Sequence, residues 1–540
     1  MKKSIIALGV VSVLLYGLVL VVSPDINTVI TAIIGLVAAL PFLSLVIIRA
    51  RFPSLEQRFK WFNLIPLYAI FMVIPLVFAI LLFMQGKLSI PLIIVMVSLA
   101  FSFFYTFLNV PLAIYHKHQE IEMAKKPLSR YPPISILIPA YNEEKCIAGT
   151  IETLLDSYYP DKEIIVIDDG STDNTYKIAQ SYARKDVMVV QRPNGGKAAA
   201  LNHGLQFAQG EIIVCVDADS MVTRGALVEL AKRFEDPSVS AVAGNIKVLN
   251  RNKLITGLQA LEYIFDINIS RRALDPLGAV VVVPGCLGSF RAEDLRASGG
   301  WDIETVVEDF DTTIKVFKGG VFNSTKHPEK VATIHLQEPD FAIATKSLKF
   351  GRVVQASSAA IAYTEAPETV RDLWKQRLRW YRGNFQAMLK HRDAFTNSRF
   401  RALYSLSFPY VLISMIFVPI GMLAVTVTGI MAILHGDAIP LLVIFGVFIM
   451  LQFLMSVLAI EMDDEDLRLA LYSPFNVLGY KHLMDIIKMK AFFDVLTKKK
   501  IGWDKLHRIG LYQKELAKRG LAGEQQGSQL PSTSIPTGQS

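Results

Sequence analysis

The 540-residue sequence contains few cysteines and few charged residues. The three cysteines, Cys146, Cys215 and Cys286, fall in a part expected to face a reducing compartment, and no pair has the spacing of zinc ligands. Their odd number also argues against a disulfide framework. Charged residues make up only 19% of the chain and hydrophobic residues 52%. Such a chain is too apolar for an ordinary soluble protein, so we expect membrane spans.

Two phosphate-binding motifs are also missing. No Gly-x-Gly-x-x-Gly follows the first predicted strand, and no Gly-x-x-x-x-Gly-Lys-Ser/Thr occurs. Neither a dinucleotide-binding fold nor a P-loop enzyme is therefore supported. The net charge of +8 does not indicate a nucleic-acid partner, because no basic helix interleaved with aromatic residues stands apart from the membrane flanks.

Six apolar runs are long enough to cross a bilayer, whose core about 30 Å thick needs roughly 20 residues of helix. They lie at 4–22, 28–48, 62–84, 89–115, 406–434 and 438–460, and none carries a central charge. Lysine and arginine gather in alternate loops, which predicts a multi-pass plasma-membrane protein with both termini cytoplasmic. A cleaved signal peptide is the alternative for residues 1–22. The poor cleavage site at Ser23, Pro24 and Asp25 favours a retained span.

The spans divide the chain into five regions. We expect four helices over 1–115, a cytosolic catalytic domain over 116–402, two helices over 403–460, an interfacial segment over 461–521 and a disordered tail over 522–540. Within the interfacial segment, residues 477–497 predict an amphipathic helix at the membrane surface. Its apolar residues are Leu483, Ile486, Ile487, Phe492 and Phe493.

The cytosolic region alternates short apolar strands with helices. Strands are predicted at 134–139, 163–167, 188–190 and 211–216, and helices near 147–155, from about 172 and over 196–208. This alternation predicts an α/β fold with a mainly parallel sheet covered on both faces. Polar clusters follow the strands, at the edge where an open α/β sheet binds its ligand.

Two pairs of aspartates end predicted strands. Asp217 and Asp219 could hold Mg²⁺ or Mn²⁺ against a diphosphate, and a solvated turn is the alternative. Asp168 and Asp169 could accept hydrogen bonds from a base imide and from ribose hydroxyls. Capping of the helix near Thr172 is their alternative role.

Three further groups complete a possible transfer site. Lys197 follows a Gly-Gly turn at a helix start, which suits phosphate. Glu308 and Asp309 begin another helix-like stretch, where a carboxylate could deprotonate an acceptor hydroxyl or simply favour the helix dipole. A third helix carries three residues on one face, which could bind phosphate and a sugar ring or lie at the membrane interface: Gln376, Arg379 and Trp380.

This ordered set resembles the processive, membrane-integrated inverting glycosyltransferases of family 2, such as cellulose, chitin, hyaluronan and poly-N-acetylglucosamine synthases. Poly-β-1,6-N-acetylglucosamine synthases look nearest, because stretches 284–291 and 367–383 are similar to theirs. The resemblance covers about 132–385 and is carried by residues 138–144, 168–173, 196–198, 217–219, 307–309 and 376–380.

The resemblance implies a GT-A fold and a role for each motif. It places the base at Asp309 and Mg²⁺ or Mn²⁺ at Asp219 with help from Asp217. The remaining implied contacts are nucleotide-sugar binding by Asp168, Asp169, Lys197 and Glu143, and an acceptor and diphosphate clamp of Gln376, Arg379, Trp380 and Glu308.

The implied function is the polymerisation of sugar from a UDP-sugar, with UDP-N-acetylglucosamine favoured, and export of the glycan through the bilayer. Its partners would be the growing glycan, the lipid bilayer and, as a candidate, an accessory membrane subunit. A non-processive enzyme that adds one sugar to a lipid carrier is the alternative. A transporter or scaffold with a nucleotide-sensing domain is another, although the spans lack the charges that often mark ion-coupled transport.

One departure from the family pattern concerns the base. Roughly thirty additional residues lie between Asp309 and the stretch 364–369, and they include a second acidic site at Glu338 and Asp340. The sequence favours Asp309 as the base and leaves open the role of residues 321–350.

Overall fold

The structure is a computed structural model that describes residues 109, 112–326, 352–434, 449, 452–453 and 455–499. Several expectations lie outside these residues: nearly all of the four N-terminal spans, the tail at 522–540, and the second acidic site in the added segment. The added segment is described only as far as residue 326.

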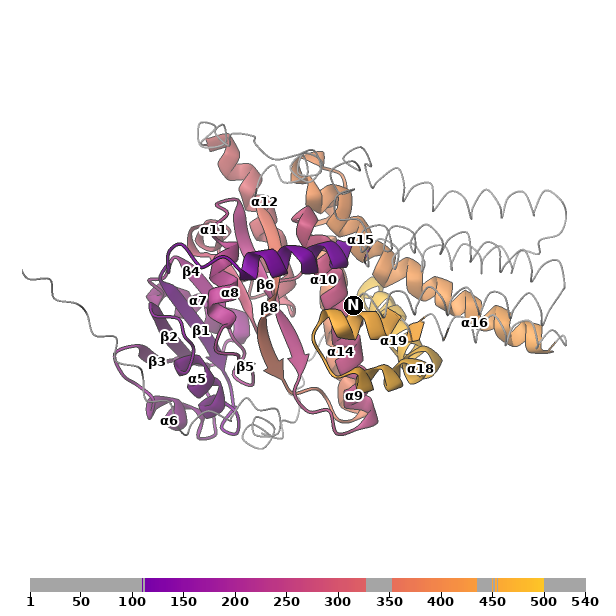
Figure 1. The fold of residues 1–540 in the computed structure, drawn as a ribbon, viewed down its shortest axis with the longest axis horizontal. Coiled ribbons are helices and arrows are strands. Elements are labelled where there is room, and N and C mark those ends of the chain that lie inside the picture. Colours follow the sequence, from indigo (N-terminus) through magenta and orange to yellow (C-terminus); the bar gives the residue numbers. More distant parts are fainter. Residues whose placement is uncertain are drawn as a thin grey trace, which may run out of the picture.

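A mixed eight-stranded sheet forms the centre of the described domain (Figure 1), in the order β3-β2-β1-β4-β7-β6-β8-β5. The first four strands are parallel and confirm the predicted strands, because each is a short apolar run between turn residues. β7 runs antiparallel to both β4 and β6, which the sequence pattern did not predict. The strands are β1 Ile134–Ala140, β2 Lys162–Asp168, β3 Val187–Gln191, β4 Ile212–Cys215, β5 Met221–Val222, β6 Val239–Val248, β7 Gly288–Arg291 and β8 Val353–Thr364.

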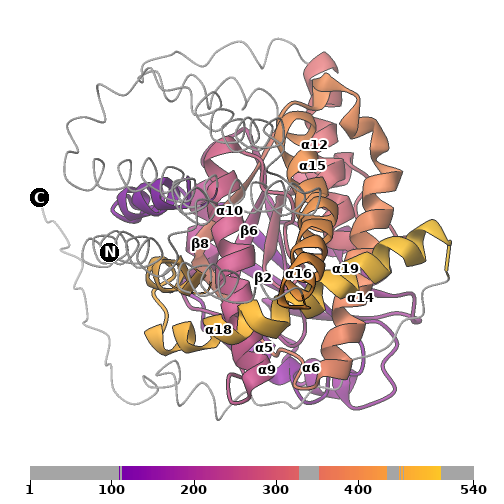
Figure 2. The ribbon, with the colours of Figure 1, turned by 90° about the vertical axis from the view of Figure 1, so that its right-hand side faces the viewer.

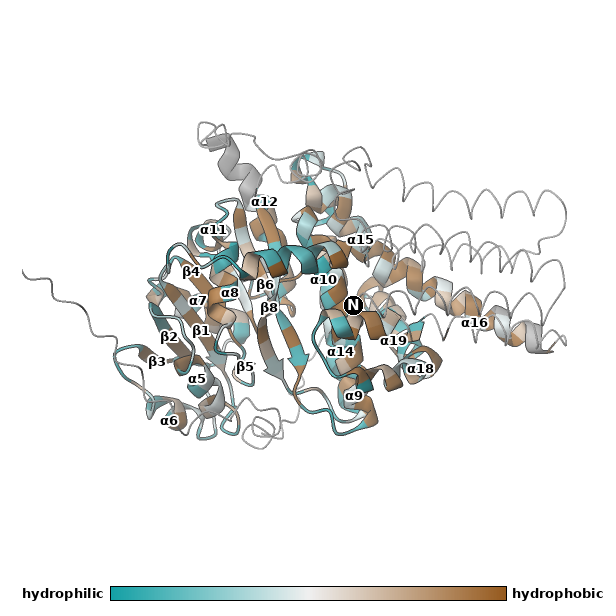
Figure 3. Ribbon diagram, in the orientation of Figure 1, coloured by the Kyte–Doolittle hydropathy of each residue, from teal (hydrophilic) through white to brown (hydrophobic). Residues whose placement is uncertain are grey.

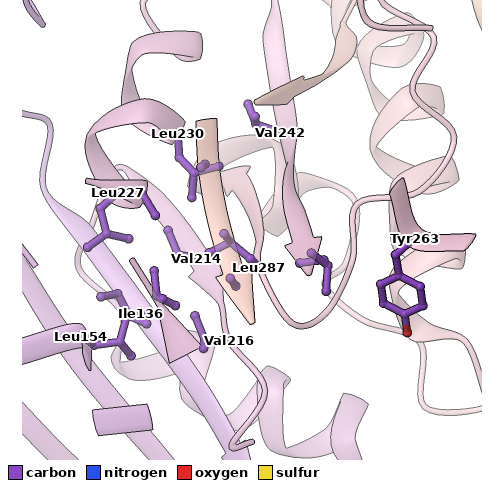
Figure 4. Packing of buried hydrophobic residues seen from close by; sticks show 14 of the residues in the cluster. Ile136, Leu154, Val214, Val216, Leu227, Leu230, Val242, Tyr263 and Leu287 are labelled. Carbon is purple, nitrogen blue, oxygen red and sulfur yellow. The ribbon is translucent and has the colours of Figure 1, made fainter. Parts of the chain in front are cut away.

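Helices cover both faces of the sheet, as the alternating pattern predicted. Successive residues of β1 enter different cores, with Ile136 on one face and Leu137 on the other. Figure 4 shows the first core, where Leu154 of α5 and Leu230 of α8 lie near Val214 of β4. The helices of this face are α5 Ile147–Leu155 and α8 Ala226–Arg233, while α7 Lys197–Phe207, α11 Ala292–Ala297, α12 Glu308–Lys326 and α14 Val370–Lys390 contribute to the second core. A short α6, Thr175–Gln180, precedes β3.

A helical segment follows β6 on the side of the domain from which α16, Val418–Leu434, extends (Figure 1). It comprises α9 Leu254–Glu262, a π-helical turn η3 Tyr263–Asn268, α10 Ile269–Leu274 and a short η4 Asp275–Leu277. The π-helical turn has wider i→i+5 bonding, which changes the direction in which the following side chains point.

One helix in the described part of the chain is long and apolar enough to cross a membrane. It spans Leu403–Met431 and has a mean hydropathy of 2.3, close to the predicted span at 406–434. It runs through η8 Leu403–Ser407, α15 Phe408–Leu412, η9 Ile413–Phe417 and α16 Val418–Leu434 after two short turns, η6 Arg392–Phe395 and η7 Ser398–Phe400. Figure 1 shows α16 extending away from the sheet, and Figure 3 shows that hydrophobic residues predominate along it. Exposed Leu423, Val427 and Ile430 favour contact with lipid.

The segment after the second expected C-terminal span returns to the domain. It contains η10 Leu467–Tyr472, α18 Ser473–Phe475, a π-helical turn η11 Asn476–Tyr480 and α19 Lys481–Leu496, which packs against α14 (Figure 2). A helix is therefore present over the stretch 477–497, as the end of η11 and α19, while its place at a membrane surface stays a prediction. Its apolar residues are divided, because Ile487 is buried against the domain while Ile486 and Phe493 are exposed.

Candidate active site

Three elements bring charged side chains together beyond the end of β4. Lys197, the first residue of α7, contacts Asp217 after β4 with Nζ 2.5 Å from Oδ1. The same ammonium lies 3.1 Å from Oε1 of Glu308, the first residue of α12. We call Lys197, Asp217 and Glu308 the Lys197 cluster. Its geometry joins motifs that are more than a hundred residues apart in the sequence.

Opposite charges keep the Lys197 ammonium protonated. Burial alone would lower its pKa, but the carboxylates of Asp217 and Glu308 outweigh that effect and hold the pKa well above its usual range. Gly285 lies directly over this contact, since an added Cβ would collide with the Lys197 ammonium. Because glycine has no Cβ, the backbone of the loop at 284–288 can lie against the Lys197 cluster at this position.

Asp309 is positioned beside this cluster, and it is predicted to be the general base. Burial and the neighbouring charge of Glu308 raise its pKa to about 6, while Lys197 acts in the opposite direction. A carboxyl group with such a pKa binds a proton more readily than an ordinary aspartate and is still largely ionised at neutral pH. That combination suits a general base.

The carboxylates of Asp217 and Asp219 are candidate ligands for a divalent cation. Asp217 has a side chain 32% exposed, whereas Asp219 is 8% exposed and accepts a 3.4 Å hydrogen bond from Ser220 Oγ. Within the described ranges, no three His, Cys, Asp or Glu side chains form a metal-binding group. The set still fits Mg²⁺ or Mn²⁺, which are commonly held by one or two carboxylates together with substrate phosphates.

The carboxylates after β2 organise the loop that leads to Lys197. Asp169 accepts hydrogen bonds from the backbone N–H groups of Gly195 and Gly196, at 3.1 and 2.7 Å from its nearer oxygens. Burial raises the pKa of Asp169, and these two N–H groups oppose the rise. Asp168 accepts from Ser171 N at 3.3 Å within the turn after β2, and this bond does not cap the expected helix, because α6 begins only at Thr175. In this arrangement, both predicted nucleotide contacts also shape the loops around the site.

Glu143, another predicted nucleotide-sugar contact, lies in the turn after β1. Its backbone N–H donates to Thr175 Oγ1 at the start of α6, over 2.7 Å. This bond joins the turn after β1 to the helix that follows Asp168 and Asp169. Glu143 is therefore held at the same edge of the sheet as those aspartates.

Helix α14 carries the predicted clamp close to Asp309. An added Cβ on Gly383 would collide with Val307, so α14 lies against the residues that precede the base. Gln376 is buried, and Trp380 is half-buried on the next turn. One plane of the Trp380 ring is covered by Arg377, whose guanidinium carbon lies 4.2 Å from the ring centroid. At most the opposite plane is left for a sugar, while Arg379 is half-buried on the same helix.

The sequence analysis missed two cations and a carboxylate near these groups. Arg377 is completely buried and pairs with Glu262, with Nη2 2.7 Å from Oε2. Arg271 lies close enough for Asp309 and Cys286 to influence its pKa, which burial lowers. The signal that could have indicated this pair is Glu262, the one acidic residue in the apolar stretch 254–264. A carboxylate buried in such a helix needs a cationic or hydrogen-bonding partner.

Comparison with known proteins identifies the domain. The model of Glycosyl transferase family 2 matches residues 135–297, which include both aspartate pairs and Lys197 but end before Glu308. Poly-β-1,6-N-acetyl-D-glucosamine synthase of Staphylococcus epidermidis is 28% identical over 306 residues, covering 56% of this chain and 64% of the relative. The synthase of Staphylococcus aureus strain COL is 30% identical over 286 residues, covering 52% and 61%.

The chain thus spans less than two thirds of the length of these curated relatives. Among solved structures, the mannosyltransferase PcManGT from Pyrobaculum calidifontis, in complex with GDP-Man and Mn²⁺, aligns with a TM-score of 0.46 and 19% identity. The alignment covers 74% of this chain and 99% of that one. The family match and the relatives confirm the resemblance to family 2 and to these synthases, while processive transfer and integration in a membrane stay predictions. Residues 135–297 are a family 2 glycosyltransferase domain, and the chain is a homologue of the poly-β-1,6-N-acetyl-D-glucosamine synthases.

Proposed function

We propose that this chain is an inverting glycosyltransferase that moves sugar from a UDP-sugar to an acceptor hydroxyl, with UDP-N-acetylglucosamine as the favoured donor. The observation that carries this proposal is the Lys197 cluster, which places a cation and two carboxylates beside the raised-pKa carboxyl of Asp309. The named activity of the Staphylococcus relatives supports the choice of sugar.

In this proposal, Asp309 accepts the proton of the acceptor hydroxyl. The oxygen then forms a bond to the anomeric carbon as the bond from that carbon to the UDP oxygen breaks, so the configuration inverts in one step. The proton ends on Asp309, and the electron pair of the broken bond leaves with UDP. Correct placement of the two reactants accounts for much of the rate in such a displacement.

The leaving diphosphate would be bound beside β4 and α7. Lys197 is one ammonium donor for it, and the backbone N–H groups at the start of α7 are others. Asp217 and Asp219 would hold Mg²⁺ or Mn²⁺, and the bound ion would neutralise charge that develops on the diphosphate. Asp169 maintains the loop that presents Lys197, through its hydrogen bonds to Gly195 and Gly196.

The acceptor would lie along α14, with Gln376, Arg379 and the accessible plane of Trp380 as its contacts. We propose that the enzyme is processive and that the membrane spans on both sides of the domain pass the glycan outward. A position of the clamp near a membrane surface is supported by the long apolar helix at Leu403–Met431, which begins soon after α14.

A nucleotide-sugar panel tests this function. Full-length protein purified in detergent would be incubated with UDP-N-acetylglucosamine, UDP-glucose and UDP-N-acetylgalactosamine, each with Mg²⁺ or Mn²⁺, while UDP release and product size are measured. We expect UDP release with UDP-N-acetylglucosamine and a long polymer as product. A single-sugar lipid would overturn processivity, and no UDP release from any donor by folded protein would overturn the proposed function.

A further inference from the structure

A buried carboxylate beneath α14 joins three elements that are far apart in the sequence. Glu262, the last residue of α9, accepts a hydrogen bond from Arg377 Nη2 at 2.7 Å. The same oxygen, Oε2, accepts from the Tyr480 hydroxyl at 2.5 Å. We call Glu262, Arg377 and Tyr480 the Arg377 cluster. It connects α9, α14 and the segment that follows the last expected span.

Each member of the Arg377 cluster depends on the others. Glu262 is 7% exposed, Tyr480 4% and Arg377 0%, so water cannot replace a missing partner. Burial would lower the pKa of Arg377, yet the Glu262 carboxylate reverses this and holds the pKa well above its usual value. Burial, reinforced by Glu262, raises the pKa of Tyr480, so its hydroxyl remains a donor. Because the Arg377–Glu262 ion pair is shielded from water, its observed geometry is the one arrangement of low energy.

The cluster supports two of the three proposed clamp residues that lie on α14. Arg377 donates from Nη1 to Gln376 Oε1 at 3.2 Å. Its guanidinium also lies against the Trp380 ring, with the guanidinium carbon 4.2 Å from the ring centroid. Tyr263 lies beside the same guanidinium, with the guanidinium carbon of Arg377 5.5 Å from the centroid of the Tyr263 ring. A shift of Arg377 would therefore displace both the amide and the ring that face the acceptor.

Irregular helical turns help these residues to meet. Glu262 immediately precedes the π-helical turn η3, and Tyr480 is the last residue of the π-helical turn η11. A single π turn rotates the side-chain sequence relative to a regular α-helix, and such turns are often found at functional sites. Here both turns adjoin the residues that form the buried contact.

We propose that Glu262, Arg377 and Tyr480 are positioning residues that fix Trp380 and Gln376 for the acceptor. This inference rests on the proposed function, because it assigns a role within the same acceptor site. It also makes the C-terminal segment, through Tyr480, part of the acceptor site although it lies about a hundred residues beyond α14.

Single-atom changes test the positioning role. Tyr480→Phe removes only the hydroxyl, while Glu262→Gln removes the charge and replaces one carboxylate oxygen by an NH₂ group, which donates instead of accepting. Tyr182→Phe is the matched control, because the Tyr182 hydroxyl donates to the Glu152 carboxylate at 2.7 Å on the exposed α5–α6 surface. UDP release would be measured against the concentration of short N-acetylglucosamine oligosaccharides and, separately, of UDP-N-acetylglucosamine.

We expect Tyr480→Phe to raise the acceptor KM by about tenfold, the effect of one lost hydrogen bond to a charged group, and to leave the donor KM unchanged. Glu262→Gln should change the same parameter, and Tyr182→Phe should change neither. Equal effects on donor and acceptor KM would mean a general structural role and overturn the inference. So would a Tyr480→Phe enzyme that behaves like the control.

A second measurement is independent of activity. The fluorescence of Trp380 is obtained as the difference between each protein and the same protein with Trp380→Phe. In Tyr480→Phe we expect a red-shifted Trp380 emission that acrylamide quenches more easily, and in Tyr182→Phe no change. If wild type transfers no sugar, the proposed function fails, and an unchanged Trp380 signal in Tyr480→Phe would separately refute the positioning role.

Discussion

Two groups of charged side chains in the same domain differ in their contact with water. In the Lys197 cluster, the side chains of Lys197 and Asp217 are 23% and 32% exposed. In the Arg377 cluster, the side chains of Arg377 and Glu262 are 1% and 9% exposed. Water can reach the Lys197–Asp217 pair, although the Glu308 side chain is only 11% exposed, whereas both members of the Arg377–Glu262 pair are shielded from water.

This contrast separates binding from positioning. The ammonium of Lys197 can exchange a carboxylate partner for a phosphate oxygen at small cost, because both arrangements are partly solvated. Arg377 cannot exchange Glu262 for anything without leaving a buried charge unpaired. A site that handles a changing ligand therefore lies beside a cluster whose geometry is fixed.

The largest expected effect comes from the group beside the Lys197 cluster. Asp309→Asn should lower the rate of sugar transfer by about 10²–10⁴-fold, the usual contribution of a general base, because the amide cannot accept the hydroxyl proton. UDP binding, measured by calorimetry, should remain nearly intact. Asp393→Asn is the control, since that exposed carboxylate pairs with Lys318. Normal turnover in Asp309→Asn would remove this residue from the mechanism.

Stability distinguishes the two clusters directly. Arg377→Met should lower the free energy of unfolding by about 3–5 kcal/mol, because the buried carboxylate of Glu262 loses its cation. Lys197→Met should change it by no more than about 1 kcal/mol, since that pair is partly exposed. Denaturant unfolding of the purified full-length protein, followed by near-ultraviolet circular dichroism, measures both.

A double variant checks the cause of the larger loss. Adding Glu262→Gln to Arg377→Met removes the unpaired charge and should restore part of the lost stability. Equal losses for Arg377→Met and Lys197→Met would contradict the distinction between the two clusters.

Donor binding should show the reverse pattern. Lys197→Met should weaken binding of UDP-N-acetylglucosamine by about 10–100-fold, the loss of a charge-assisted hydrogen bond. Lys232→Met is the control, because Lys232 pairs with Glu229 on α8, away from the site. Titration of the donor in the presence of Mg²⁺, followed by calorimetry, gives the dissociation constants. Unchanged affinity in Lys197→Met would mean that this ammonium serves only its carboxylate partners.

The sequence was informative where structure is local. β1 to β4 were predicted nearly in full, because each is a continuous apolar run bounded by turn residues. The order of β7, β6 and β8 was not predicted, since pairing between strands distant in the chain leaves no periodic signal. The motifs at Asp217 and Asp309 were found because they follow strands or open helices.

The Arg377 cluster shows the limit of that approach. Arg377 lies within a motif that drew attention to Arg379 and Trp380, and no local pattern indicates which of two arginines is buried. Its partner Glu262 is 115 residues away, and Tyr480 is 218 residues from Glu262. Only the packing of α9, α14 and η11 brings these residues together, so their contact could not be predicted from spacing.

The smallest expected effect concerns the pH dependence of transfer. Because burial and Glu308 raise the pKa of Asp309 to about 6, the rate should fall below pH 6 as the base becomes protonated. Glu308→Gln removes a negative charge beside Asp309, so the pKa should fall and the acidic limb of the pH–rate profile should move to lower pH. Lys197→Met removes a positive charge and should move that limb to higher pH. Profiles of kcat/KM from pH 5 to 8 measure both shifts, and shifts in the same direction would show that Asp309 is not the titrating group.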